Sequence, residues 1–105
     1  MVADGTVAVT YYDFRNNDAS PGAPTDYWIV HCHSNCSSPA SWSSESHLTG
    51  PFDIEQAPAA RGPFGYFLGE YEGLTSTGNV FRPLFVAVNN GDASNPTDVF
   101  TTTAG

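Results

Sequence analysis

Apolar and polar residues alternate with a period of two in several short stretches of the chain. Between residues 5 and 12, Val7 and Val9 alternate with small and polar side chains, and two tyrosines follow. Because successive side chains of a strand point to opposite faces of a sheet, this pattern predicts a β-strand. The same signals predict further strands, so that the full set is residues 5–12, 26–33, 42–48, 66–74, 80–88 and 98–103. No segment has a helical period, and we therefore expect an all-β fold.

Turn-forming residues mark the connections between these strands. Residues 16–25 and 89–97 are rich in Asn, Asp, Gly and Pro and are predicted to be loops. Residues 49–65 are Pro-rich and are predicted to form a long irregular connection. Pro83 lies inside the predicted strand 80–88. Because proline cannot donate to a sheet ladder, we expect an edge position or a bulge there.

One stretch of the first half returns in the second half. The segments Asn16–Ser20 and Pro24–Asp26 correspond to Asn89–Ser94 and Pro96–Asp98, each between two predicted strands. Two copies of a strand–loop–strand unit are typical of antiparallel blades repeated in a propeller. In this alignment Asp13 and Arg15 correspond to Val86 and Val88. The fold therefore does not require charges at residues 13 and 15, which makes these two residues functional candidates.

The charge of the chain excludes some classes of partner. The 105 residues contain three Arg, no Lys and eleven carboxylates, which gives a formal charge of −8 and a pI near 4.3. Binding to nucleic acid or to an anionic membrane depends on cations that neutralise phosphates. We therefore expect neither nucleic acid nor a membrane as a partner. The sequence also lacks an apolar run of the roughly 18 residues that a membrane-spanning helix needs.

The two cysteines, Cys32 and Cys36, flank a short turn that contains Ser34 and Asn35. A disulfide that closes this turn is the favoured prediction, with free thiols and a metal site including His31 or His33 as alternatives. In a strand, the two histidines point to one face and Cys32 to the other, which argues against a metal, and we expect none. A disulfide indicates an oxidising compartment, so we expect a secreted, extracellular or periplasmic protein. The start of the chain lacks signal-peptide features, which fits a mature or shortened segment.

Several stretches together resemble sialidase-like proteins with Asp-box (BNR) repeats. They are GTVAVTYYDFR, DYWIVHCHSN, the turn that ends in Ser41-Trp42, FLGEYEGL and GNVFRPLFVAV. An Asp box reads Ser-x-Asp-x-Gly-x-Thr-Trp, and here only its Ser41-Trp42 end matches, because Ser37 and Pro39 occupy the Asp and Gly positions.

The resemblance implies antiparallel propeller-blade sheets in a single all-β unit, about one and a half blades of a six-bladed propeller. Residues 5–48 would be a partial first blade, residues 66–105 a partial second blade, and residues 49–65 their Pro-rich connection. Both cut edges would be exposed. We therefore expect a homo-oligomer, with a trimer that closes a ring as the favoured state. Self-pairing or a small sandwich is the alternative.

The family's chemistry implies particular site residues. In family sialidases, arginines hold the sugar carboxylate, a Tyr–Glu pair supplies the nucleophile and an Asp acts as acid and base. Carried over, Tyr71 with Glu70 and Asp13 would be catalytic, and Arg15, Arg82 and Trp28 would bind substrate; Arg61 is the remaining arginine. The alternative is structural: a salt bridge between Asp13 and Arg15, and aromatic residues that belong to the core.

The resemblance therefore predicts a glycan-directed propeller segment of the sialidase type. It would be complete only as an oligomer or within a longer parent, and whether it is an enzyme stays open. A lectin-like carbohydrate-binding module without turnover, or a structural fragment, is the alternative. Its partner is expected to be carbohydrate, and no cofactor is expected.

Overall fold

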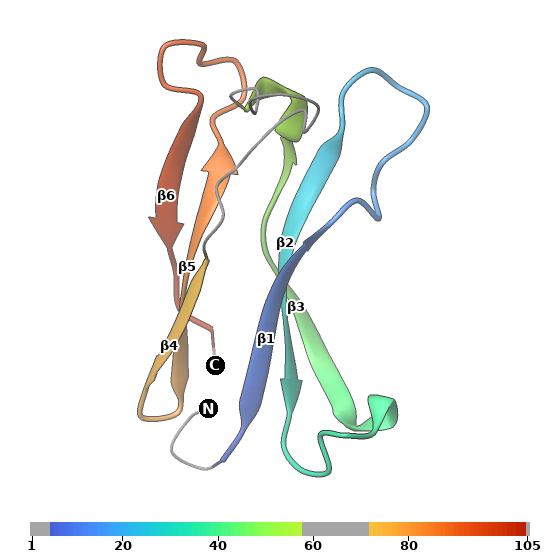
Figure 1. Ribbon diagram of the computed structural model, residues 1–105, viewed down its shortest axis with the longest axis vertical. Helices are drawn as coiled ribbons and strands as arrows, with labels where there is room; N and C mark the ends of the chain where they lie inside the picture. Colours follow the sequence, from blue (N-terminus) through green and yellow to red (C-terminus); the bar gives the residue numbers. More distant parts are fainter. Residues whose placement is uncertain (1–4, 58–71, 105) are drawn as a thin grey trace.

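The protein is built from two antiparallel sheets of three strands each, in a computed structural model that describes residues 5–57 and 72–104 (Figure 1). The strands of the first sheet are β1 (Val7–Asp13), β2 (Pro24–Cys32) and β3 (Trp42–Asp53). Those of the second are β4 (Gly73–Thr77), β5 (Val80–Val88) and β6 (Thr97–Thr101). Two short 3₁₀ turns, η1 (Pro39–Ser41) and η2 (Ile54–Gln56), flank β3. The all-β prediction is confirmed.

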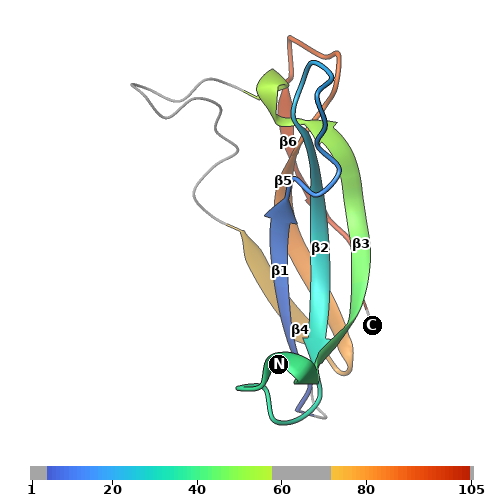
Figure 2. The same cartoon turned by 90° about the vertical axis from the view of Figure 1, so that its right-hand side faces the viewer.

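The two sheets pack face to face as a two-layer sandwich (Figures 1 and 2). Tyr27 and Phe52 of the first sheet share a buried cluster with Phe85 of the second. The rings of Tyr27 and Phe85 stack with centroids 4.5 Å apart. Ile29 and Phe81 form a second buried contact between the layers. The described residues form neither a closed barrel nor a propeller ring. Their arrangement is the small sandwich, the alternative to a ring.

β5 has its predicted bounds, β1, β2 and β6 differ from theirs by one or two residues at each end, and β3 and β4 differ most. β3 continues to Asp53, five residues beyond the predicted end, because Thr49 and Phe52 still pair with β2 across register shifts. Gly50 and Pro51 interrupt the alternation of apolar and polar residues, which is why the sequence pattern predicts a loop from residue 49. β4 occupies Gly73–Thr77, where the sequence predicted a strand end and a turn. The remaining parts of the predicted connection and fourth strand, residues 58–71, lie outside the described residues.

Pro83 lies neither on an edge strand nor at a bulge, because the pairs Phe81–Ala104 and Leu84–Thr101 on either side of it share one register, and this prediction is wrong. β5 is the central strand of its sheet. Phe81 exchanges both backbone hydrogen bonds with Ala104, so the backbone of Pro83, two residues later, also faces the β6 side. The β5–β6 ladder is interrupted there, since its regular pairing begins at Leu84 opposite Thr101. The Thr101 hydroxyl donates to the Pro83 carbonyl at 2.8 Å, and the missing N–H falls in the gap.

The internal repeat has a structural counterpart in its loops. Asn16 donates from Nδ2 to Oδ2 of Asp26 at 2.8 Å, and Asn89 donates to Oδ2 of Asp98 at the same distance. In both loops an aspartate side chain accepts a hydrogen bond from a backbone N–H two residues later, in the pairs Asp18–Ser20 and Asp92–Ser94. Both loops stand at the same end of the sandwich (Figure 1). The repeated sequence therefore forms the same loop-to-strand connection twice.

Cys32 and Cys36 form a disulfide that closes the turn after β2, with Cα atoms 5.8 Å apart. Asn35 takes the left-handed conformation that reverses the chain (φ 54°), and Trp42 donates from Nε1 to the Cys36 carbonyl at 3.0 Å. The described ranges contain no group of three or more His, Cys, Asp or Glu that could hold a metal ion. Nor does the described part of the chain include a helix long and apolar enough to cross a membrane.

A tyrosine hydroxyl between the sheets leads to a prediction for alkaline pH. Tyr12 donates to the Val86 carbonyl at 2.7 Å and accepts from the Val86 N–H at 3.0 Å. Burial raises the pKa of Tyr12 to about 12. Because the folded state holds this proton more tightly than the unfolded state, the associated stability is present below pH ~10 and is lost as pH rises through about 12.

We expect the absorbance of tyrosinate to show a late-titrating class in the folded protein that is absent in concentrated denaturant. Burial also raises the pKa of Tyr27, so Tyr12→Phe should reduce this class without abolishing it. A titration near pH 10 for every tyrosine of the folded protein would contradict the assignment.

Candidate functional site

The structure brings together three of the residues predicted for the site. Asp13, Arg15 and Trp28 meet on the outer face of the first sheet. Arg82 is exposed on β5 of the second sheet, opposite Thr75, and does not join them. The other predicted site residues, Glu70 and Tyr71, lie outside the described residues, as does Arg61.

Strand register explains why Trp28 shares one face of the first sheet with side chains of β1 and β3. Trp28 lies opposite Tyr11 on one side and opposite His47 on the other, so the three side chains form a row across the sheet. Their neighbours Tyr12 and Tyr27 point the other way and pack in the core. The site residues therefore stand on the face of the first sheet that the second sheet leaves uncovered.

Arg15 is the centre of this group, which we call the Arg15 cluster: Tyr11, Asp13, Arg15, Trp28 and Glu45. The guanidinium donates from Nε to Asp13 Oδ2 at 2.6 Å. It also donates from Nη1 and Nη2 to the two Glu45 oxygens at 2.5 and 3.1 Å. The Tyr11 hydroxyl donates to the same Glu45 carboxylate. Bidentate contacts of this kind fix the orientation of the guanidinium as well as pairing its charge, so the group is held in one position.

The Trp28 ring serves as the support of this arginine. Arg15 Cζ lies 3.8 Å from the Trp28 ring centroid, within the range of a cation–π contact. The indole Nε1 donates to Asp13 Oδ1 at 3.0 Å, which ties the ring to the same carboxylate. Arg15 thus covers one face of the Trp28 ring, and Trp28 helps to position the guanidinium.

The same contacts determine the protonation of Asp13. Burial by itself would raise the pKa of this carboxyl, but hydrogen bonds from Arg15 and Trp28 and the Arg15 charge outweigh it. The net result is an Asp13 pKa below its ordinary value. A general acid must retain its proton near the working pH, so these contacts favour a carboxylate that accepts hydrogen bonds over one that donates a proton.

A second polar group lies beside the Arg15 cluster. Asp26 is fully buried, and its oxygens accept hydrogen bonds at 2.8 Å from Asn16 Nδ2 and lie 2.7 Å from His47 Nε2. The His47 ring in turn contacts Trp28 edge to face, with centroids 4.9 Å apart. The Asp26 carboxyl therefore holds His47, which packs against Trp28 of the Arg15 cluster.

Sequence reasoning missed Glu45, His47 and Asp26 as parts of this face. Glu45 and His47 alternate within the predicted strand 42–48, so period two indicated that they share a face. Their contact with Arg15 and Trp28 depends on the pairing of β3 with β2, which includes a register shift beside Ser44 (φ 54°). Phe14, which stands between Asp13 and Arg15 in the chain and is 53% exposed, is a further aromatic residue that sequence reasoning did not assign to the site.

The fold and site together define a small two-layer β-sandwich with a polar and aromatic sheet face. Comparison with models of known families, with curated proteins and with solved structures finds no match to this chain. The resemblance to sialidase-like proteins therefore stays a prediction.

Proposed function

We propose that this chain is a carbohydrate-binding module without catalytic turnover and that the Arg15 cluster is its sugar-binding surface. The observation that carries the proposal is a guanidinium fixed between two carboxylates and a tryptophan on an open sheet face. The side chains of Arg15, Asp13 and Glu45 are 38%, 26% and 35% exposed, so all three are accessible to a ligand.

The chemistry of a sugar hydroxyl matches this arrangement. Each hydroxyl donates one hydrogen bond and accepts others. Asp13 and Glu45 offer acceptor oxygens, and Arg15 retains one N–H, on Nη1, besides the four that bond Asp13, Glu45 and the Tyr11 hydroxyl. Because the three side chains are already held in place, little conformational entropy is lost when a sugar binds. The exposed Phe14 offers an apolar ring next to these polar groups in the chain.

The charges favour a neutral sugar over an acidic one. Arg15 already contacts two carboxylates, so a ligand carboxylate would have to displace one of them. The whole chain carries a formal charge of −8, which repels anions. Arg82 is on the other sheet and gives this face no second cation. We therefore place hydroxyl-rich neutral glycans, rather than sialic acids, as the ligand class.

The same residues make the sialidase-type activity the weaker alternative. A clamp for a sugar carboxylate needs arginines that converge, whereas Arg15 lies in the loop after β1 of the first sheet and Arg82 lies on β5 of the second. The lowered pKa of Asp13 does not suit a general acid. Both observations support binding without turnover.

Titration of the protein with a panel of neutral and sialylated glycans tests this proposal. We expect saturable binding to a neutral glycan and at least a tenfold loss of affinity for Arg15→Ala, roughly 1.4 kcal/mol. Arg82→Ala removes a cation from the opposite sheet and is the matched control, with affinity unchanged. Binding to sialosides alone, release of sugar from a sialoside, or loss of binding only in Arg82→Ala would contradict the proposal.

The proposal includes a secreted, extracellular or periplasmic location. The Cys32–Cys36 disulfide supports it, because disulfides persist in oxidising compartments and are rare where thiols are kept reduced.

A further inference from the structure

The outer edge of β6 carries backbone groups that the sheet does not use. Phe81 and Ala104 form a hydrogen-bonded pair, so the backbone groups at every second residue along β6, Asp98 and Phe100, face β5. The N–H and C=O groups of Thr97, Val99 and Thr101 consequently face away from the sheet. β6 is the last strand in the order β4-β5-β6, and these groups form a template for another strand.

This edge has few of the features that protect edge strands. It has no Pro, Gly or bulge, and its one charged residue, Asp98, has its carboxylate bonded to the amides of Asn89 and Asn95 at 2.8 and 2.9 Å. Val99 is 63% exposed and Phe100 39%. By contrast, β3, the edge strand of the other sheet on this side, contains Pro51 and several register shifts. Of β3 and β6, β6 therefore offers the more regular and less protected edge.

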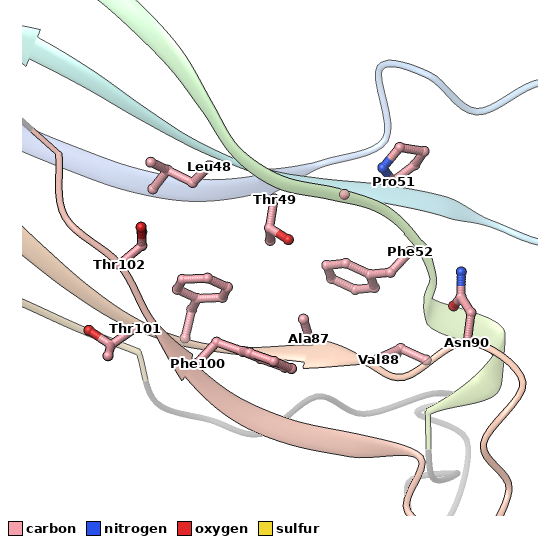
Figure 3. Close-up of a pocket in the computed structure, with 12 residues that line it drawn as sticks. Leu48, Thr49, Pro51, Phe52, Ala87, Val88, Asn90, Phe100, Thr101 and Thr102 are labelled. Atoms are coloured by element: carbon pink, nitrogen blue, oxygen red, sulfur yellow. The ribbon is translucent and has the colours of Figure 1, made fainter.

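An open groove lined by apolar and uncharged polar residues lies beside this edge (Figure 3). It has a volume of about 470 Å³ between β3 and the pair β5–β6, and its floor includes Phe52, Phe85 and Phe100. Its rim carries Thr and Asn side chains, and no described residue that lines it is ionisable. A strand added to β6 would extend the second sheet along the open side of this groove and would cover Phe100, the aromatic lining residue that is still 39% exposed.

We propose that this strand is β6 of a second copy, paired antiparallel about a two-fold axis at Val99. Val99 then faces the partner's Val99, and Thr97 faces the partner's Thr101. The outward N–H and C=O groups of these residues are all paired in this register. Asp98 faces the partner's Phe100, so no two carboxylates are opposite each other.

The second copy is the occupant because β6 is complementary to itself in this register. A two-fold pairing needs the same patch on both molecules, and here threonine faces threonine and valine faces valine. On the outer face of this sheet, Val99 pairs with Val86. Thr101 pairs with Leu84, which is 50% exposed. The apolar outer surface of one copy's sheet would therefore continue into that of the partner. The formal charge of −8 on each copy opposes the pairing, and salt should therefore strengthen it.

Sedimentation of the full chain over a concentration series, at low and moderate salt, tests this dimer. We expect a monomer–dimer equilibrium that salt shifts toward dimer. Val99→Pro removes an N–H that points away from the sheet and leaves the β5–β6 bonds intact, so it should weaken dimerisation at least tenfold. Val99→Ala keeps that N–H and serves as the matched control, with a smaller loss.

A second variant keeps the test decisive if Val99→Pro fails to fold. Val99→Asp places two carboxylates opposite each other across the axis, and its dimer should form only at raised salt. A monomer at every concentration, a trimer, or a dimer that neither variant weakens would overturn the proposal. Sugar binding by a monomer would leave the proposed function standing, so the two proposals fail separately.

Discussion

Replacing Gly50 by alanine should destabilise the protein more than any other glycine substitution in the described ranges. A Cβ at residue 50 would lie 2.7 Å from the Thr25 carbonyl oxygen, 2.8 Å from Asp26 Oδ1 and 3.0 Å from Asp26 Cα. Two of these atoms are backbone of the central strand β2, which cannot shift without disturbing both of its ladders. Gly50 also has φ +112°, a conformation that residues with a side chain rarely adopt.

We expect Gly50→Ala to lower the free energy of unfolding by about 3–4 kcal/mol, as the sum of backbone strain and steric overlap. For a domain of this size that is a large part of a total of roughly 5–15 kcal/mol. Denaturant unfolding followed by tryptophan fluorescence measures it. Gly78→Ala is the matched control, because Gly78 has φ +60° but no atom within 4 Å of an added Cβ. Its loss should stay near 1 kcal/mol. Equal losses in the two variants would contradict the close-approach argument.

The second large effect is expected at Asp26. Asp26→Ala would leave Asn16 and His47 without the buried carboxyl that both contact. We expect a loss of about 2–3 kcal/mol of unfolding free energy, because donors next to a buried site lose their acceptor. Since His47 packs against Trp28, the Arg15 cluster should also loosen and sugar affinity should fall.

The repeat supplies the control for this substitution. Asp98 accepts the same 2.8 Å hydrogen bond from its own asparagine, Asn89, but it is exposed. Asp98→Ala should therefore cost less than about 1 kcal/mol. If Asp98→Ala were as damaging as Asp26→Ala, burial would not be the reason for the effect.

The resemblance to sialidase-like proteins and the structure agree at the level of short antiparallel strands. The repeated loop, in which Asn16–Asp26 and Asn89–Asp98 make equal hydrogen bonds, follows from the internal sequence repeat and not from the resemblance. A propeller ring with a centrally placed active site requires more blades than the described residues form. The Arg15 cluster needs none of these additional blades, since β1, β2 and β3 and the loop after β1 supply it.

The sequence by itself determined the class of secondary structure, the strand β5, the repeated loops and the candidacy of Asp13, Arg15 and Trp28. These features depend on local properties: alternation along a strand, turn residues, and charges at positions where the repeat has valines. The central position of Pro83 was not predictable, because it depends on a gap in pairing with residues further along the chain.

Only the tertiary structure decided what the candidate residues do. Asp13 and Arg15 are close in the chain, but Glu45 reaches Arg15 only because β3 pairs with β2 in one register. That register also turns Trp28 outward under Arg15 and Tyr27 inward against Phe85. Neighbouring residues thus receive opposite roles from the pairing of strands distant in sequence, and the sequence pattern alone contains no signal for which strands pair.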